Sequence, residues 1–153
     1  MKKKYYIAYG SNLDTMQMKF RCPGARPVGV TFLPNHELLF KGSKTGSYLT
    51  VEPCEGSSVA CAVWEVTQQD EQNLDRYEGY PDFYYKEDQE VTVQPFSNRA
   101  PKPMTVFIYK MHEERPLGKP SKQYLETCLR GYRNFGFDIT RLFDAYSRSV
   151  QEE

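Results

Sequence analysis

The sequence predicts an α+β domain in which a mixed, mostly antiparallel sheet curls into a small barrel-like form with flanking helices. Three observations support this fold class. β-Branched and aromatic runs dominate from Tyr5 to Met111, one helical segment interrupts them, and helical periodicity returns only after Pro120. Several short antiparallel strands in a compact chain tend to curl or close. With 153 residues the chain fits one domain, which we expect to span 1–153.

Composition argues against several classes of function. The 20 basic and 20 acidic residues balance, so no net field favours nucleic acid or an anionic membrane. No apolar run approaches the roughly 20 residues that span a bilayer, and the run Tyr5–Ala8 is too short for a signal peptide. We therefore expect a cytoplasmic protein with no nucleic-acid or membrane partner, and the oligomeric state stays open.

The cysteines carry no metal-binding pattern. Cys22, Cys54, Cys61 and Cys128 form no C-x-x-C pair, and neither histidine stands at a zinc-like spacing from them. In a reducing compartment we expect free thiols. No local sequence marks one of them as a nucleophile, and we expect no metal site.

The N-terminal elements follow from composition and spacing. Residues 5–9 are β-branched and aromatic and predict a strand that enters a tight loop at 10–12. A short helix is expected over 13–20, where apolar residues recur at helical spacing. Either Asn12 or Asp14 is its N-cap.

The middle of the chain has β character. Its expected strands cover 28–33, 36–40, 47–52 and 58–66. The dipeptide Pro34-Asn35 predicts a hairpin turn, and 53–56 predicts a second break between strands. The run Val59–Trp64 is almost continuously apolar, so its strand should be central and buried on both faces.

Helix signals become clear in the second half. Thr67 to Asp70 resembles a capping box, and Gly79 followed by Pro81 should end the helix that it begins. The remaining expected elements are strands at 83–95 and 104–111 and helices from Pro120 to Gly136 and over 139–150.

Two segments have features that suit a binding or catalytic site. In Tyr9–Leu13, successive backbone N–H groups after a strand can bind an anionic or carbonyl oxygen, although such loops also form for purely geometric reasons. Tyr124, in the first turn of a helix, either reaches a pocket with its hydroxyl or packs in the core.

Glu78 stands at the predicted end of a helix, where the helix dipole disfavours a carboxylate. Tyr77, Tyr80 and the aromatic run 83–85 would surround it with apolar surface. Both effects raise a carboxyl pKa toward neutrality, which suits a general base at cellular pH. A solvent-exposed glutamate at a helix end is the alternative.

Three segments together resemble the γ-glutamylcyclotransferase family. Tyr9–Leu13 matches the family's Y-G-S-N-L loop in full, after the first strand. The segment 74–81, LDRYEGYP, is similar to the family segment that carries the catalytic glutamate and ends E-G-Y-P. Pro120-Ser121-x-x-Tyr124, followed by a helix with Gly131-Tyr132, is similar to its C-terminal substrate-contacting tyrosine segment. The three motifs occur in family order over most of the chain.

The resemblance implies a barrel-like fold and a reaction in which a γ-glutamyl amide or amino acid cyclises to 5-oxoproline and releases an amine. No metal or organic cofactor is implied. Glu78 would be the catalytic general acid/base. The implied substrate-binding residues are Tyr9, Gly10, Ser11, Asn12, Leu13, Tyr84 and Tyr124. On a strand Tyr84 and Tyr85 point to opposite faces, so which of them faces the pocket stays open.

The expected partner is then a small γ-glutamyl molecule. The three motifs do not indicate which amine it carries. γ-Glutamyl-lysine, an acylated biosynthetic intermediate and glutathione all remain candidates. A non-catalytic small-molecule binding module on the same scaffold is the alternative from another class, and the presence of Glu78 argues against it. A nucleic-acid or protein adaptor gains no support from the balanced charge.

Overall fold

The computed structural model describes residues 3–43 and 45–151. Its strands are β1 (Lys4–Ala8), β2 (Arg26–Ser43), β3 (Gly46–Val66), β4 (Tyr84–Pro95) and β5 (Lys102–Met111). Its helices are the 3₁₀ helix η1 (Ser11–Leu13) and the α-helices α1 (Thr15–Arg21), α2 (Gln68–Glu78), α3 (Lys122–Phe135) and α4 (Thr140–Ser149).

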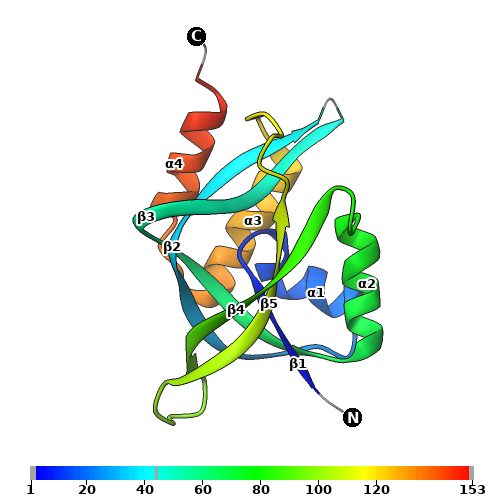
Figure 1. Cartoon of the computed structure of the whole chain (residues 1–153), viewed down its shortest axis with the longest axis vertical. Helices are drawn as coiled ribbons and strands as arrows, with labels where there is room; N and C mark the ends of the chain where they lie inside the picture. Colours follow the sequence, from blue (N-terminus) through cyan, green and yellow to red (C-terminus); the bar gives the residue numbers. More distant parts are fainter. Residues whose placement is uncertain (1–2, 44, 152–153) are drawn as a thin grey trace.

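The strands form a closed barrel in the order β1-β3-β2-β4-β5, with the helices around it (Figure 1). Neighbouring strands are antiparallel except β1 and β5, which run parallel and close the barrel where Tyr6 pairs with Phe107. The expected α+β fold with a mixed, mostly antiparallel, barrel-like sheet is confirmed. None of the helices in the described part is long and apolar enough to cross a bilayer.

The central strand is also confirmed. β3 pairs with β1 on one side and with β2 on the other, and from Val59 to Val66 most of its side chains are buried. The apolar run Val59–Trp64 thus lies between two neighbouring strands in the core. All four cysteines are free, as expected.

The hairpin expected at Pro34-Asn35 is wrong. β2 continues through these residues, and the register against β3 shifts between Pro34 and His36. Asn35 adopts a positive φ of 59°, and its side-chain oxygen accepts a hydrogen bond from Gly56 N at 3.1 Å. The residues that predicted two turns therefore form one bulge between two long strands. The predicted break at 53–56 is wrong for the same reason.

The helix α1 forms where it was expected, but its apolar face is exposed. Asp14 is its N-cap and accepts a hydrogen bond from Met16 N at 3.2 Å, whereas Asn12 belongs to η1. Met16 is 79% and Phe20 91% exposed, so the apolar stripe points away from the core. Met18 is the residue of α1 that is buried.

Local signals place the helix ends that matter for function. Thr67 and Asp70 form the capping box of α2, and Gly79, with a φ of 67°, ends that helix in the left-handed conformation. Gly131 lets α3 approach η1, because a Cβ there would lie 2.5 Å from Leu13 Cβ. Gly79 thereby sets the end of α2, and Gly131 sets how closely the second half of α3 packs on the loop after β1.

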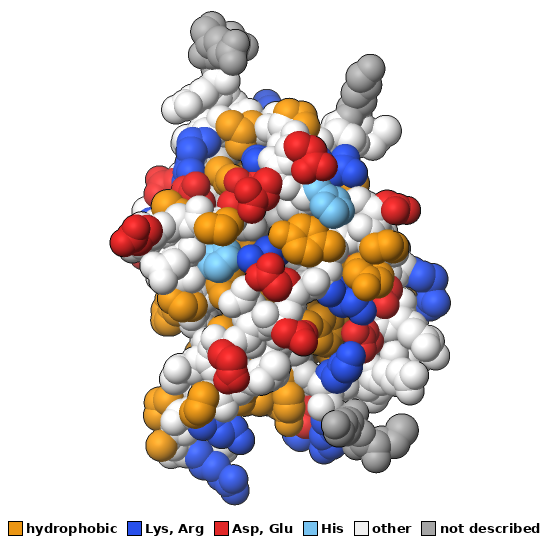
Figure 2. Space-filling view, in the orientation of Figure 1, with side chains coloured by type: hydrophobic (Ala, Val, Ile, Leu, Met, Phe, Trp, Pro, Cys, Tyr) orange, Lys and Arg blue, Asp and Glu red, His pale blue; other side chains and the backbone are white. Residues whose placement is uncertain are grey.

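The surface shows no dominant charge on the face drawn in Figure 2, where acidic and basic side chains are interspersed. Several of them form ion pairs across strands or between a helix and the barrel. Lys110 with Glu87 and Lys86 with Glu71 are examples, at 2.9 and 2.8 Å.

Candidate active site

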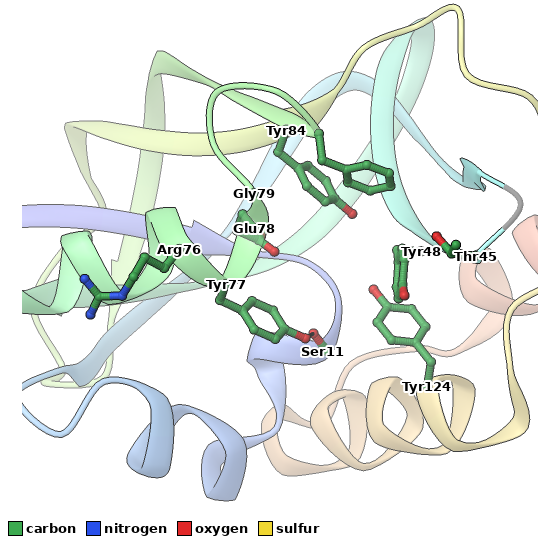
Figure 3. Close-up of a pocket in the computed structure, with 10 residues that line it drawn as sticks. Ser11, Thr45, Tyr48, Arg76, Tyr77, Glu78, Gly79, Tyr84 and Tyr124 are labelled. Carbon is green, nitrogen blue, oxygen red and sulfur yellow. Dashed lines mark hydrogen bonds between the residues drawn. The ribbon is translucent and has the colours of Figure 1, made fainter.

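A cavity of about 380 Å³ lies beside the C-terminal end of α2 (Figure 3). A small polar recess adjoins it and shares Ser11, Glu78, Tyr84 and Tyr124 with it. Residues from the loop after β1 and from β3, α2, β4 and α3 line the two spaces. The volume suits a small molecule of roughly the size of an amino-acid derivative.

The structure brings most of the predicted site residues together. Those that line the cavity or its recess are Tyr9, Gly10, Ser11, Asn12, Glu78, Tyr84 and Tyr124. Leu13 lines neither space. Its side chain is fully buried in the core beside Gly131, where it anchors the loop instead of facing a ligand.

Glu78 is the last residue of α2, and Figure 3 shows its side chain directed toward the space between Tyr77, Tyr84 and Tyr124. No described residue forms a hydrogen bond with its carboxyl. Burial raises the pKa of Glu78 to about 8, and the positive charge of Arg21 opposes this shift. The carboxyl therefore exchanges a proton near neutral pH, as the sequence led us to expect, with loss of water contact as the main cause.

Two tyrosines face Glu78 from β4 and α3. Tyr84 Oη donates a hydrogen bond to Leu49 O at 2.7 Å, and Tyr124 Oη accepts one from Leu49 N at 3.1 Å. Burial raises the pKa of both hydroxyls, so they remain neutral hydrogen-bonding groups. The ring of Tyr85 instead lies 5.1 Å from that of His112, so Tyr84 is the residue of the pair that faces the cavity.

The loop after β1 forms the floor of the recess. A Cβ on Gly10 would lie 3.3 Å from Tyr124 Oη, so the glycine allows the loop to approach this hydroxyl. Among the described residues, no hydrogen bond accounts for the backbone N–H groups of Ser11 and Asn12. Tyr9 contributes its backbone and ring, since its hydroxyl already donates to Tyr109 O at 2.7 Å.

Sequence reasoning missed Tyr48 and Arg21. The ring of Tyr48 lies 5.1 Å from that of Tyr124 and lines the larger cavity, outside the recess. The Arg21 guanidinium lies 3.3 Å from the centre of the Tyr77 ring. Both contacts join segments far apart in the chain, so no local pattern could have identified either residue.

The fold and the site define a class of protein: a closed α+β barrel with a small-molecule cavity that combines one half-buried carboxyl with neutral tyrosine hydroxyls. The sequence profile of the family described as "Gamma-glutamyl cyclotransferase, AIG2-like" matches residues 6–126. The chain belongs to this family. It is 32% identical over 143 residues to a Bos taurus protein named Gamma-glutamylcyclotransferase, and the match covers 88% of this chain and 72% of that protein.

Solved structures agree with this assignment. A structure named Gamma-glutamyl cyclotransferase superposes with a TM-score of 0.78 at 26% identity, over 99% of this chain and 89% of that one. An uncharacterized protein from Homo sapiens superposes with a TM-score of 0.74 at 26% identity, with the same coverage. The resemblance inferred from the three motifs is confirmed, and the names of these relatives support an enzyme class. A small-molecule substrate is consistent with that class.

Proposed function

We propose that the protein is a γ-glutamylcyclotransferase that converts a γ-glutamyl amide or γ-glutamyl amino acid to 5-oxoproline and releases the amine. One observation carries the proposal. The Glu78 carboxyl, with a pKa of about 8, lines the same recess as the loop Tyr9–Asn12. A proton acceptor thus lies beside backbone N–H donors that have no hydrogen-bond partner among the described residues, in a cavity of substrate size.

The reaction suits this arrangement because the substrate carries both reactants. Its α-amino nitrogen attacks its own γ-carbonyl carbon, so a site that holds the chain folded supplies on the order of several kcal/mol. An α-ammonium group has a pKa of about 8 and must lose a proton before it can attack. Glu78 is the acceptor for that proton, a role worth roughly 10²- to 10⁴-fold in rate.

The protons and bonds balance through Glu78. Loss of the first proton frees the nitrogen lone pair, and the new carbon–nitrogen bond closes a five-membered ring. The ring nitrogen then loses a second proton, which passes to water or to the departing amine, as it becomes an amide. Glu78 delivers a proton to the leaving nitrogen as the original carbon–nitrogen bond breaks, so the amine departs as a neutral group or ammonium ion.

The other polar groups of the site would bind different parts of the substrate. The N–H groups of Ser11 and Asn12 donate to substrate oxygens, including the oxyanion that develops on the γ-carbonyl. Tyr124 accepts from Leu49 N, so its own proton can be donated to the substrate. The Tyr84 hydroxyl donates its proton to Leu49 O, so its oxygen can accept a hydrogen bond from the α-ammonium group of the substrate.

The lining of the larger cavity, outside the recess, affects which leaving amine the site can bind. Its walls include the rings of Tyr48 and Phe83 together with Arg76, and Glu78 is the only acidic residue among its described lining. An amine with an additional positive charge would find no acidic partner there. This favours leaving groups that are neutral or anionic, such as the amino acid of a γ-glutamyl amino acid.

The test is release of 5-oxoproline from a panel of γ-glutamyl amides with neutral, acidic and basic leaving amines. Wild type should turn over members of the panel, and Glu78→Gln should lose at least a hundredfold in rate. Glu126→Gln is the matched control, because Glu126 is an exposed acid of α3 outside the cavity. A wild type that binds γ-glutamyl ligands by calorimetry and releases no 5-oxoproline would instead be the binding module.

A further inference from the structure

Arg21 contacts both walls of the candidate site. It is the last residue of α1, and its guanidinium lies 3.3 Å from the centre of the Tyr77 ring on α2. Its Nη1 donates a hydrogen bond to the side-chain oxygen of Asn12, and its Nη2 donates to Gln17 Oε1 at 2.7 Å. One planar cation therefore stacks on the helix that carries Glu78 and also binds the loop after β1.

The two walls also contact each other directly. Tyr77 Oη lies 3.3 Å from Ser11 Oγ. Asn12 Nδ2 also donates to Tyr6 Oη at 2.9 Å, which attaches the loop to β1. These contacts form a closed ring through Arg21, Tyr77, Ser11 and Asn12, because Ser11 and Asn12 are adjacent in the chain. A change in the position of the guanidinium must move the helix end, the loop or both.

We propose that Arg21 is a positioning residue that holds the last turn of α2 against Ser11 and Asn12 and so sets the separation between the Glu78 carboxyl and the loop N–H groups. The effect on turnover rests on the proposed function. Glu78 directly follows Tyr77, so a shift of the stacked ring is passed to the carboxyl. Arg21 itself does not line the cavity, and it acts through Tyr77 and Asn12.

Arginine is suited to this position and lysine is not. A guanidinium can stack flat on an aromatic ring while its in-plane N–H groups donate to two acceptors at once. A lysine ammonium keeps the charge but offers no plane. Replacement of Arg21 by lysine should therefore separate the contribution of geometry from that of charge.

Charge makes a second, measurable contribution. The titratable groups near Glu78 on the surrounding elements are neutral tyrosines: Tyr6, Tyr9, Tyr84, Tyr109 and Tyr124. Arg76, on the same helix as Glu78, also lines the cavity, but Figure 3 shows its guanidinium directed away from Glu78. In the described part of the chain, Arg21 is the one cation that lowers the pKa of Glu78. Its removal should raise that pKa, whereas removal of a distant cation should leave it unchanged.

The kinetic test compares Arg21→Met and Arg21→Lys with Lys19→Met. Lys19 is an exposed cation of the same helix with no hydrogen bond or ion pair to the described residues. We expect Arg21→Met to lower kcat ten- to a hundredfold with a smaller change in KM, Arg21→Lys to fall between, and Lys19→Met to match wild type. In a Tyr77→Leu background the further loss from Arg21→Met should be much smaller, since its partner is gone.

A titration without turnover completes the test. The ¹³C carboxyl signal of Glu78, assigned by its absence in Glu78→Gln, should titrate at higher pH in Arg21→Met than in wild type or Lys19→Met. If wild type releases no 5-oxoproline, the proposed function fails and this titration alone decides the role of Arg21. Equal titration in all three proteins, or fully additive kinetic losses for Arg21→Met and Tyr77→Leu, would overturn the proposal.

Discussion

Tyr84 and Tyr124 bind opposite backbone groups of one residue. The Tyr84 hydroxyl donates to Leu49 O at 2.7 Å, and the Tyr124 hydroxyl accepts from Leu49 N at 3.1 Å. Since both hydroxyls line the cavity, each presents its unused capacity to a ligand: Tyr124 a proton, Tyr84 a lone pair. Leu49 thereby assigns complementary roles to two chemically identical side chains.

Replacement of either hydroxyl should affect both catalysis and stability. Tyr124→Phe leaves Leu49 N without a partner and removes a donor to the substrate, so we expect kcat/KM to fall roughly 10- to 100-fold and stability to fall by about 1 kcal/mol. Tyr84→Phe should act similarly through Leu49 O. Steady-state kinetics and urea unfolding measure the two effects. Tyr85→Phe, on the opposite face of β4, should keep wild-type kinetics, and a loss there equal to that of Tyr84→Phe would contradict this assignment.

The pH dependence of kcat/KM should report Glu78. A general base must be deprotonated in the free enzyme, and burial raises the pKa of Glu78 to about 8. We therefore expect kcat/KM to rise between pH 6 and pH 8 and to level off above it, measured with a substrate whose own amine pKa is known. A profile that is already flat from pH 5 upward would mean that Glu78 is not the base.

The same carboxyl should make stability depend on pH. The folded pKa of about 8 lies above the ordinary value of 4.5, so between these values the folded state binds more protons than the unfolded state. Stability must then fall as pH rises across this window. Glu78→Gln should lack this decline and exceed wild type by about 4–5 kcal/mol at pH 9, with little difference at pH 4. Urea unfolding of both proteins at the two pH values tests the sign, and a wild type that gains on the variant as pH rises would contradict it.

The contact of Gly131 with Leu13 should be sensitive to one methyl group. A Cβ at Gly131 would meet Leu13 Cβ at 2.5 Å and Asp14 N at 2.6 Å, and one of these atoms is backbone. Gly131→Ala should therefore cost about 1–3 kcal/mol of stability, because α3 must move away from the loop. Thermal or urea unfolding measures the loss. Thr127→Ala, on an earlier turn of α3, is the comparison, and equal stability of the two variants would show that the close approach is not required.

Local chemistry in the sequence was enough to predict the position of Glu78. Thr67 and Asp70 begin α2, and Gly79 ends it, so the glutamate had to stand at the helix end wherever the helix lay. The same holds for Tyr124, which Ser121 places in the first turn of α3 by accepting a hydrogen bond from Tyr124 N. Such contacts join residues a few positions apart, so their energies can be read from spacing.

Local chemistry was misleading at Pro34-Asn35. The dipeptide favours a turn when only its neighbours are considered. In the folded chain the Asn35 side chain binds Gly56 N, and the two long strands stay paired on both sides of the bulge. Long-range pairing outweighed the local turn preference.

By itself, the sequence determined most of the elements, the α+β class and the three motifs of the family, because these depend on short-range periodicity, capping and recognisable order along the chain. Only the tertiary structure decided that Tyr84 and not Tyr85 faces the cavity, that Leu13 is an anchor in the core, and that Arg21 stacks on Tyr77. Each of these depends on which distant segment lies alongside, and short-range periodicity does not specify that choice.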